Sequence, residues 1–246
     1  MELTYLLIGL GTFLVARGAN ASTNAGTPSK GGASSKSLVD KSSPPPKSVD
    51  IPQGARADLI RRLYNGAIPK FDFVSYAFAI AQPESGGKYR PLNQKAADMG
   101  YPLGLNQYGF AGIYQVGAQG LEDQGFIKAG TWATDGTGGN YEIFTSKNPS
   151  YWTSKCPNGL EQFLNTPELQ ESAFIGFTMA HYRRLKAKGI LSDDSPAAVK
   201  GGYLSAAHLK GMGGATSLFR GRSTVDGNGT STAYYYKIGS NSQASS

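Results

Sequence analysis

Apolar residues between positions 51 and 240 recur at helical rather than strand spacing. Residues 55–64 (ARADLIRRLY) place three apolar side chains on one helical face. Residues 71–81 (FDFVSYAFAIA) are almost wholly apolar and predict a buried helix that ends at Pro83. No stretch alternates apolar and polar residues over the length of a strand. The pattern therefore predicts a mainly α fold.

Proline in the expected first turn marks two further helices. Residues 167–186 begin with proline and continue with apolar periodicity, and residues 196–204 predict a shorter helix of the same kind. Between the helices lie two stretches rich in Gly, Asn and Tyr, residues 86–117 and 130–158, which predict long loops.

An apolar segment opens the chain. Residues 1–17 contain an unbroken run of apolar and small side chains, short for a membrane-spanning helix but similar in length to the apolar region of an export signal. Ala19 and Ala21 fit a signal cleavage site, whereas Glu2 and the lack of any basic residue before the run do not fit a secretory signal. We favour a membrane-associated anchor over a cleaved signal.

A low-complexity segment follows. Residues 18–50 are dominated by Ser, Gly, Pro, Thr and Lys, and almost nothing there could be buried to offset the entropy of ordering the chain. This composition predicts a flexible, disordered linker that gives the next part of the chain reach. The expected organisation is an anchor or signal (1–17), the linker (18–50), one domain (51–240) and a short tail (241–246).

The charge of the chain favours an anionic partner. Lys and Arg number 24 against 17 Asp and Glu, which gives a formal net charge of +7. A membrane surface, a nucleic acid or an acidic polymer such as a cell wall would each suit this charge. Because the basic residues are scattered rather than gathered in a stripe, we do not expect nucleic acid as the partner.

The sequence gives no reason to expect a metal or a cofactor. The single cysteine, Cys156, excludes an intrachain disulfide, and the two histidines form no His-Glu-x-x-His motif of the kind found in zinc peptidases. Residues 226–231 (DGNGTS) space oxygen ligands as a calcium loop does. However, Ser231 and Lys237 stand where such a loop needs glycine and glutamate, so we expect a plain turn.

The most informative acidic residue is Glu84, in the sequence Pro83-Glu84-Ser85-Gly86-Gly87. It directly follows the apolar helix, and the glycines after it let the chain turn away and leave space beside the carboxyl group. A carboxyl group at a poorly hydrated helix end can stay protonated and act as a general acid. Glu84 is therefore a candidate catalytic acid. The local sequence would also suit a surface glutamate in a turn.

Two downstream motifs accompany Glu84. They are Gly112-Ile113-Tyr114-Gln115 and Ala206-Ala207-His208-Leu209-Lys210-Gly211. Together with Glu84-Ser85, and in this order, they resemble the lysozyme-like superfamily. Within it, the closest resemblance is to phage-associated muralytic domains akin to soluble lytic transglycosylases and goose-type lysozymes. The resemblance covers residues 73–236, and it implies a lysozyme-like helical domain with long Gly- and Tyr-rich loops.

The resemblance implies roles for five residues. Glu84 would be the catalytic acid, and Ser85, Tyr114, Gln115 and His208 would line the substrate cleft. Tyr114 could stack on a sugar face, and Gln115 could hydrogen-bond a saccharide. Alternatively, Tyr114 could be a core residue and Gln115 an exposed loop residue. Two departures are visible: His208 stands where related enzymes commonly carry tyrosine followed by asparagine, and residues 130–158 form an insert without a counterpart.

Most glycosidases need a second carboxylate, about 5–5.5 Å from the first for retention or about 6.5–9.5 Å for inversion. None of the available candidates stands in a context that demands this role. They are Asp98, Glu122, Asp123 and Asp135. This favours a mechanism with a single glutamate, in which the sugar's own N-acetyl group or 6-hydroxyl replaces the second carboxylate, as the transglycosylase resemblance implies.

The sequence therefore predicts an enzyme that cleaves the glycan strands of bacterial peptidoglycan. We expect it to be associated with a membrane or a virion, where it would open the periplasmic cell wall during phage entry, possible partners being other virion proteins. A catalytically inactive wall-binding protein of the same fold and an endopeptidase acting on the peptide stems remain the alternatives.

Overall fold

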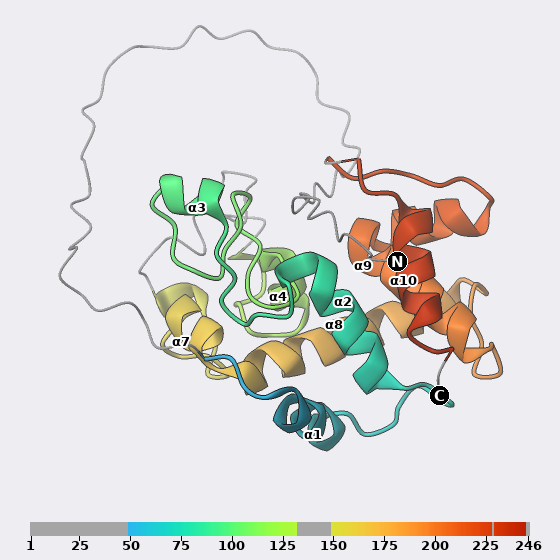
Figure 1. Ribbon diagram of the computed structural model, residues 1–246, viewed down its shortest axis with the longest axis horizontal. Helices are drawn as coiled ribbons and strands as arrows, with labels where there is room; N and C mark the ends of the chain where they lie inside the picture. Colours follow the sequence, from blue (N-terminus) through green and yellow to red (C-terminus); the bar gives the residue numbers. More distant parts are fainter. Residues whose placement is uncertain (1–48, 132–148, 228, 245–246) are drawn as a thin grey trace, which may run out of the picture.

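A computed structural model describes residues 49–131, 149–227 and 229–244, and over these residues the protein is mainly helical (Figure 1). Paired backbone in this part is confined to isolated bridges, such as Ile127 with Trp152, so the expectation of a mainly α fold is confirmed. The helices are α1 (Gln53–Leu63), α2 (Phe73–Ser85), α3 (Gln94–Asp98), α4 (Ala118–Asp123), α7 (Leu160–Asn165), α8 (Pro167–Ala187), α9 (Ala197–Phe219) and α10 (Thr232–Asn241), with a 3-10 turn at Pro149–Tyr151.

Helices α2 and α8 lie at the centre of the molecule (Figure 1). Helix α1 packs against both, while α9 and α10 pack together on one side and contact α8 and α2 respectively. Helices α3, α4 and α7 and the long loops lie on the other side. Buried aromatic and aliphatic side chains from all of these helices except α3 join in one continuous core, to which α10 contributes Tyr235.

Helix α2 runs two residues past the end predicted from Pro83. Asp72 caps its first turn by accepting a hydrogen bond from Ser75 N at 3.1 Å. A proline removes one backbone donor, which predicted the end of the helix, but its neighbours keep helical bonding. Gly86 N donates to Gln82 O at 2.9 Å and Gly87 N to Ala81 O at 3.1 Å. Glu84 therefore lies in the last helical turn rather than beyond it.

Helix α9 is longer than the 196–204 segment predicted from sequence. It continues to Phe219 through a kink at Lys210 and Gly211, where the backbone leaves helical geometry. Gly211 has φ = 62°, in the left-handed region that glycine enters at little cost, so the chain can bend and resume a helix. The predicted helix over 167–186 is confirmed, with Pro167 in its first turn.

Helices α9 and α10 approach so closely that only glycine fits at their crossing. A Cβ atom built on Gly201 would lie 2.2 Å from Gly239 O, and one built on Gly239 would lie 2.1 Å from Gly201 O. No side chain can be accommodated at such separations. This close crossing fixes where the side chains of α10 point, including Tyr235 in its first turns.

The folded domain is slightly larger than the range 51–240 expected from sequence. Asp50, assigned to the linker, accepts a hydrogen bond from Tyr89 N at 2.9 Å, and Val49 packs against the core. Gln243, assigned to the tail, is buried. The apolar run and most of the linker lie outside the described residues. Within the described residues, no helix is both long enough and apolar enough to cross a membrane.

Gln243 should contribute measurably to stability. Its amide nitrogen donates to Asp72 O at 2.9 Å and its amide oxygen accepts from Asp72 N at 3.0 Å. The Gln243→Ala change would remove the acceptor of Asp72 N and one of two donors to Asp72 O, the other being Tyr76 N, so we expect the free energy of unfolding to fall by about 1–3 kcal/mol. Urea denaturation measures this, with the neighbouring exposed Ala244→Ser as a control. An unchanged unfolding midpoint for Gln243→Ala would contradict the expectation.

Candidate functional site

Glu84 is held at the end of α2 by groups from two other helices. Its side chain is nearly inaccessible, since the residue is 3 % exposed. The Tyr235 hydroxyl, from α10, donates a hydrogen bond to Glu84 Oε1 at 2.7 Å. His208 Nε2, from α9, lies 3.3 Å from the same oxygen. The structure thus brings together Glu84 and His208, two residues singled out from sequence, and adds Tyr235.

Tyr235 acts as a hydrogen-bond donor over the ordinary pH range. Burial, and then the adjacent Glu84 carboxylate, raise the pKa of its hydroxyl well above the usual value. Ser231 positions the residue by capping α10, where its side chain accepts from Tyr234 N at 3.1 Å. Sequence reasoning missed Tyr235 because it is one of three consecutive tyrosines in the first turns of this helix. Only the packing of α10 on α9 and α2 distinguishes the tyrosine that faces Glu84.

His208 is fixed by aromatic side chains of α8. Its ring meets Phe174 and Phe177 edge to face, with centroids 5.6 Å and 5.8 Å away. Edge-to-face contacts of this kind orient a ring without blocking its nitrogens. The side chain is 5 % exposed and faces Glu84. The structure therefore places His208 beside the carboxyl group, in a position suited to orienting it.

A second histidine, His181, lies behind this site. It packs edge to face on Phe177 at 4.3 Å and is 4 % exposed. Neither of its ring nitrogens has a hydrogen-bond partner in the described part of the chain. Burial, followed by the proximity of His208 and Arg184, lowers its pKa to about 3. His181 is accordingly neutral at physiological pH.

Tyr114 does not occupy the position expected for a sugar-stacking residue. It is 1 % exposed, and its ring stacks on Phe174 with centroids 3.7 Å apart. Its hydroxyl donates to Glu171 Oε2 at 2.5 Å, and Arg56 donates to it at 2.7 Å. Because the ring lies inside the core, no sugar can stack on it, and the assignment of Tyr114 to the substrate cleft is corrected to a structural role.

The group that holds Tyr114 is a buried ion pair. Glu171 is 0 % exposed and Arg56 is 3 % exposed, and Arg56 Nε lies 2.8 Å from Glu171 Oε1. Tyr89 also donates to Glu171, at 2.7 Å. One carboxylate on α8 thereby ties together α1, the start of the long loop and the Gly112–Gln115 turn. Sequence reasoning missed this cluster because its members are far apart in the chain.

Gln115 lies in a strained turn of that loop. Its φ is 47°, a left-handed value that is uncommon outside glycine. It is 5 % exposed and its amide nitrogen donates to Gly112 O at 2.7 Å, while its amide oxygen has no partner among the described residues. Strained residues with unsatisfied polar atoms often occur at functional sites. Among the described residues Gln115 makes no hydrogen bond with Glu84, so its role in substrate binding stays a prediction.

Ser85 is satisfied by its own helix. Its hydroxyl donates to Ala81 O at 3.0 Å and the residue is 5 % exposed. A serine that bonds the carbonyl four residues earlier is a common arrangement within helices. Its hydroxyl makes no hydrogen bond with Glu84, so its role in substrate binding stays a prediction.

Of the four second-carboxylate candidates, the three that the structure describes are engaged elsewhere. Asp98 accepts from Gln94 at 2.8 Å on α3, Asp123 pairs with Arg184 at 3.1 Å, and Glu122 accepts from Gly130 N at 2.8 Å. Asp135 lies outside the described residues. In the part that is described, no acidic side chain contacts Glu84.

Asp226 is the acidic residue with a demonstrable influence on the site. It is 6 % exposed, and its Oδ1 accepts from Thr230 N at 2.8 Å, which closes the turn expected from residues 226–231. Its negative charge also contributes to the raised pKa of Tyr235. Within the described residues, this turn belongs to no cluster of side chains that could hold a metal ion.

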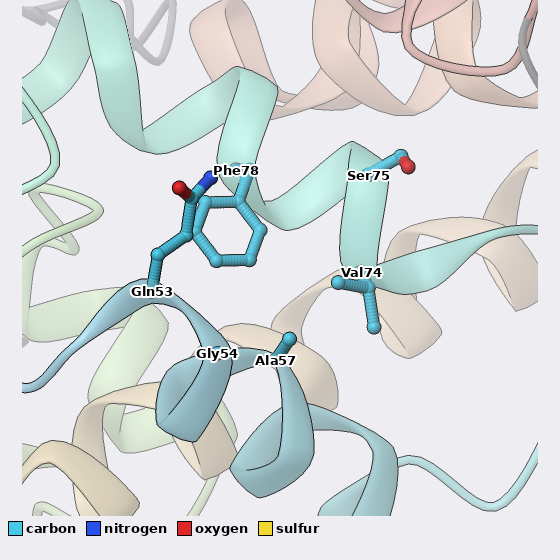
Figure 2. A pocket seen from close by; sticks show the side chains of 6 residues that line it. All are labelled: Gln53, Gly54, Ala57, Val74, Ser75 and Phe78. Atoms are coloured by element: carbon cyan, nitrogen blue, oxygen red, sulfur yellow. The ribbon is translucent and has the colours of Figure 1, made fainter.

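A separate groove lies between α1 and α2, with a volume of about 570 Å³ (Figure 2). It is lined by Gln53, Gly54, Ala57, Val74, Ser75 and Phe78. At a rise of about 1.5 Å per residue, Ser75 and Glu84 are roughly 13 Å apart along α2. No titratable side chain lines the groove, so it offers no acid–base chemistry, and Glu84 remains the candidate site.

Comparison of the chain with protein-family models, with curated proteins and with solved structures finds no match. The candidate site is therefore described by its own geometry. Its central features are a buried carboxyl group at a helix end, a tyrosine and a histidine directed at one of its oxygens, and a neutral histidine behind them.

The depressed pKa of His181 predicts a pH-dependent stability. Above about pH 6.5 the residue is neutral in both the folded and the unfolded chain, so it adds no pH dependence. As the pH falls from 6.5 toward 3, the unfolded chain takes up a proton that the folded protein does not, and the folded state loses stability. The loss should be on the order of 2 kcal/mol by about pH 5.

His181→Leu tests this, because leucine is apolar and of similar size. We expect the variant to lose less stability than the wild type when urea unfolding at about pH 5 is compared with unfolding at about pH 7.5. Carboxylates that titrate in this range affect both proteins alike. Equal losses in the two proteins would show that His181 is not held neutral.

Proposed function

We propose that this protein cleaves the glycan strands of bacterial peptidoglycan, with Glu84 as the general acid. The observation that carries the proposal is the setting of the Glu84 carboxyl group, which is buried at the end of α2 with Tyr235 and His208 directed at one oxygen. The lysozyme-like order of motifs around Glu84, Gln115 and His208 supports the same reaction. The positive net charge suits an acidic wall.

The two oxygens of Glu84 are not equivalent. Oε1 accepts the Tyr235 hydroxyl and faces His208, whereas Oε2 makes no hydrogen bond or ion pair with a described residue. In the acid form of the carboxyl group the proton would therefore reside on Oε2, since Oε1 already serves as acceptor. This gives Tyr235 and His208 the role of orienting the carboxyl group, and Oε2 the role of donating the proton.

In the proposed reaction, Glu84 Oε2 donates its proton to the glycosidic oxygen as the bond from that oxygen to the anomeric carbon breaks. The leaving sugar departs with a new hydroxyl group, and Glu84 is left as a carboxylate. The carboxylate then accepts the proton of the attacking hydroxyl as the new bond to the anomeric carbon forms. The enzyme returns to its starting state, with one glycosidic bond exchanged for another C–O bond.

The attacking hydroxyl would be the 6-hydroxyl of the same sugar. A hydrolytic enzyme needs a carboxylate that activates water, and Asp98, Glu122 and Asp123, the described candidates for that role, are engaged elsewhere. An intramolecular hydroxyl requires less help, because its effective concentration at the reacting carbon is large. We therefore propose a lytic transglycosylase rather than a simple muramidase.

The composition of the amino-terminal segments fits this function, although most of these residues lie outside the described part of the chain. Residues 1–17 would attach the protein to a membrane or a virion, and the linker would let the domain reach the wall from that point. An inactive wall-binding protein of the same fold is the chief alternative. It differs in predicting binding to murein without any change in the murein.

The Glu84→Gln variant should abolish murein cleavage while leaving the fold intact. The amide has nearly the same size but no acidic proton, and loss of general acid catalysis costs at least about 10²-fold in rate. Zymography with the full-length chain measures the loss. The matched control is Glu168→Gln, an exposed glutamate of α8, which should clear murein normally. Near-normal clearing by folded Glu84→Gln would rule out the assignment, and no clearing by the wild type would favour the binding alternative.

The product is expected to end in a 1,6-anhydro sugar. Capture by the 6-hydroxyl gives a fragment lighter by one water than the hydrolytic product, and mass spectrometry of unreduced digests separates the two. Predominantly reducing-end products would instead identify a hydrolase. In that case Asp226→Asn, Asp98→Asn and Asp123→Asn should be compared, because a water-activating carboxylate would then be required.

A further inference from the structure

The connection between α9 and α10 carries an unpaired positive charge. From residue 197 to residue 244 the chain has five basic residues and one acidic residue, and the acidic residue, Asp226, is buried. Arg220 and Arg222 are exposed on this connection, which extends outward beyond the two helices (Figure 1). Of the chain's net charge of +7, +4 thus lies at the end of the molecule that supplies His208 and Tyr235.

These two arginines differ from most others in the protein. Elsewhere in the described residues, five arginines lie 2.8 to 3.6 Å from a carboxylate. They are Arg56, Arg61, Arg62, Arg90 and Arg184. Arg220, Arg222 and Arg183 form no ion pair within the described part of the chain. Two unpaired guanidinium groups two residues apart are well suited to bind carboxylates from outside, because each can form a bidentate pair.

The connection that carries the arginines is hydrogen-bonded to the helix that supplies Tyr235. The side-chain hydroxyl of Ser223, next to Arg222, accepts a hydrogen bond from Ala233 N at 3.2 Å. Thr232 N donates to Thr224 O at 2.8 Å. The connection is thereby fixed on the first turn of α10. Tyr235, which contacts Glu84, lies two residues after Ala233.

Exposed apolar side chains lie on the same connection and at the adjoining ends of α9 and α10. Phe219 is 50 % exposed, Val225 is 57 % exposed and Tyr234 is 55 % exposed. A surface that combines guanidinium groups with aromatic rings suits a ligand that has carboxylates on an otherwise uncharged body. An anionic membrane surface would also suit it, but the anchorage on α10 beside Tyr235 favours the molecule that reaches Glu84.

We infer that Arg220 and Arg222 bind the carboxylates of the peptide stems, so that the preferred substrate is glycan that still carries its stems. This inference rests on the proposed function. A glycan strand bound at Glu84 carries its stems alongside, and their free carboxylates supply the negative charge that the connection lacks. The two arginines are specificity-determining residues, which act on substrate binding and not on the proton transfer.

The test compares two substrates that share one glycan: strands with stems, and the same strands from which an amidase has removed the stems. For the full-length Arg220→Gln/Arg222→Gln variant, we expect KM for strands with stems to rise about three- to ten-fold, with kcat unchanged. KM for stripped strands should stay at the wild-type value. Added salt should raise the wild-type KM for strands with stems and affect the variant less.

Arg183→Gln is the matched control, since it removes an exposed, unpaired arginine from α8 and should leave both KM values unchanged. The inference is overturned if the double variant keeps the wild-type KM on strands with stems, or if it loses equally on both substrates. It is also overturned if KM is kept while binding to phosphatidylglycerol vesicles is lost, because the surface would then face a membrane.

A binding measurement separates this inference from the proposed function. Calorimetry with the Glu84→Gln variant should show tighter binding to strands with stems than to stripped strands, and the difference should vanish when Arg220 and Arg222 are also replaced. If the wild type cleaves neither substrate but this difference is present, the proposed function fails and the inference stands. If cleavage occurs and the difference is absent, the inference fails alone.

Discussion

The buried ion pair between Arg56 and Glu171 is the interaction on which the helical framework depends. Two charges removed from water are tolerated only when each is paired and hydrogen-bonded, and here two tyrosine hydroxyls complete the shell of the carboxylate. Loss of one partner from such a pair commonly costs about 3–5 kcal/mol. The pair joins α1 to α8 and holds the loop that carries Tyr114. Because α8 also supplies Phe174 and Phe177, the same framework fixes the His208 ring.

The candidate site is assembled by two kinds of packing that have little in common. On one side, aromatic rings of α8 orient His208. On the other, the crossing of α9 and α10 leaves no room for any side chain between Gly201 and Gly239, and so sets the direction of Tyr235. Glu84 lies where these two arrangements meet. In the proposed reaction the proton-donating oxygen of Glu84 must be directed at the reacting atom, and the two neighbours on Oε1 would provide that orientation.

The sequence predicted the helices better than it predicted their contacts. Apolar periodicity and proline placement gave the helices at 55–64 and 167–186 because these are local signals. Pro83 misled because a proline near a helix end removes one hydrogen bond without ending the helix. The length of α9 was missed because the kink at Lys210 and Gly211 interrupts the helix within a glycine-rich stretch, and the helix resumes after it.

Motif order identified Glu84 and His208, which the structure brings within 3.3 Å of each other. The same motif misassigned Tyr114, because sequence cannot tell an aromatic residue of a cleft from one of the core. Tyr235 and Arg56 carried no signal at all, since each acts through a partner more than 100 residues away, Glu84 and Glu171 respectively. Long-range pairings of this kind appear only when the helices are packed.

Helix α10 and the residues just after it contact α2 at both of its ends, and the two helices run antiparallel. Tyr235 meets Glu84 in the last turn of α2, and Gln243 binds Asp72 at the first. The two helices are thus joined by hydrogen bonds near both ends, and the position of the carboxyl group depends on how the pair packs together. Thermal inactivation should therefore coincide with cooperative loss of the whole fold instead of preceding it.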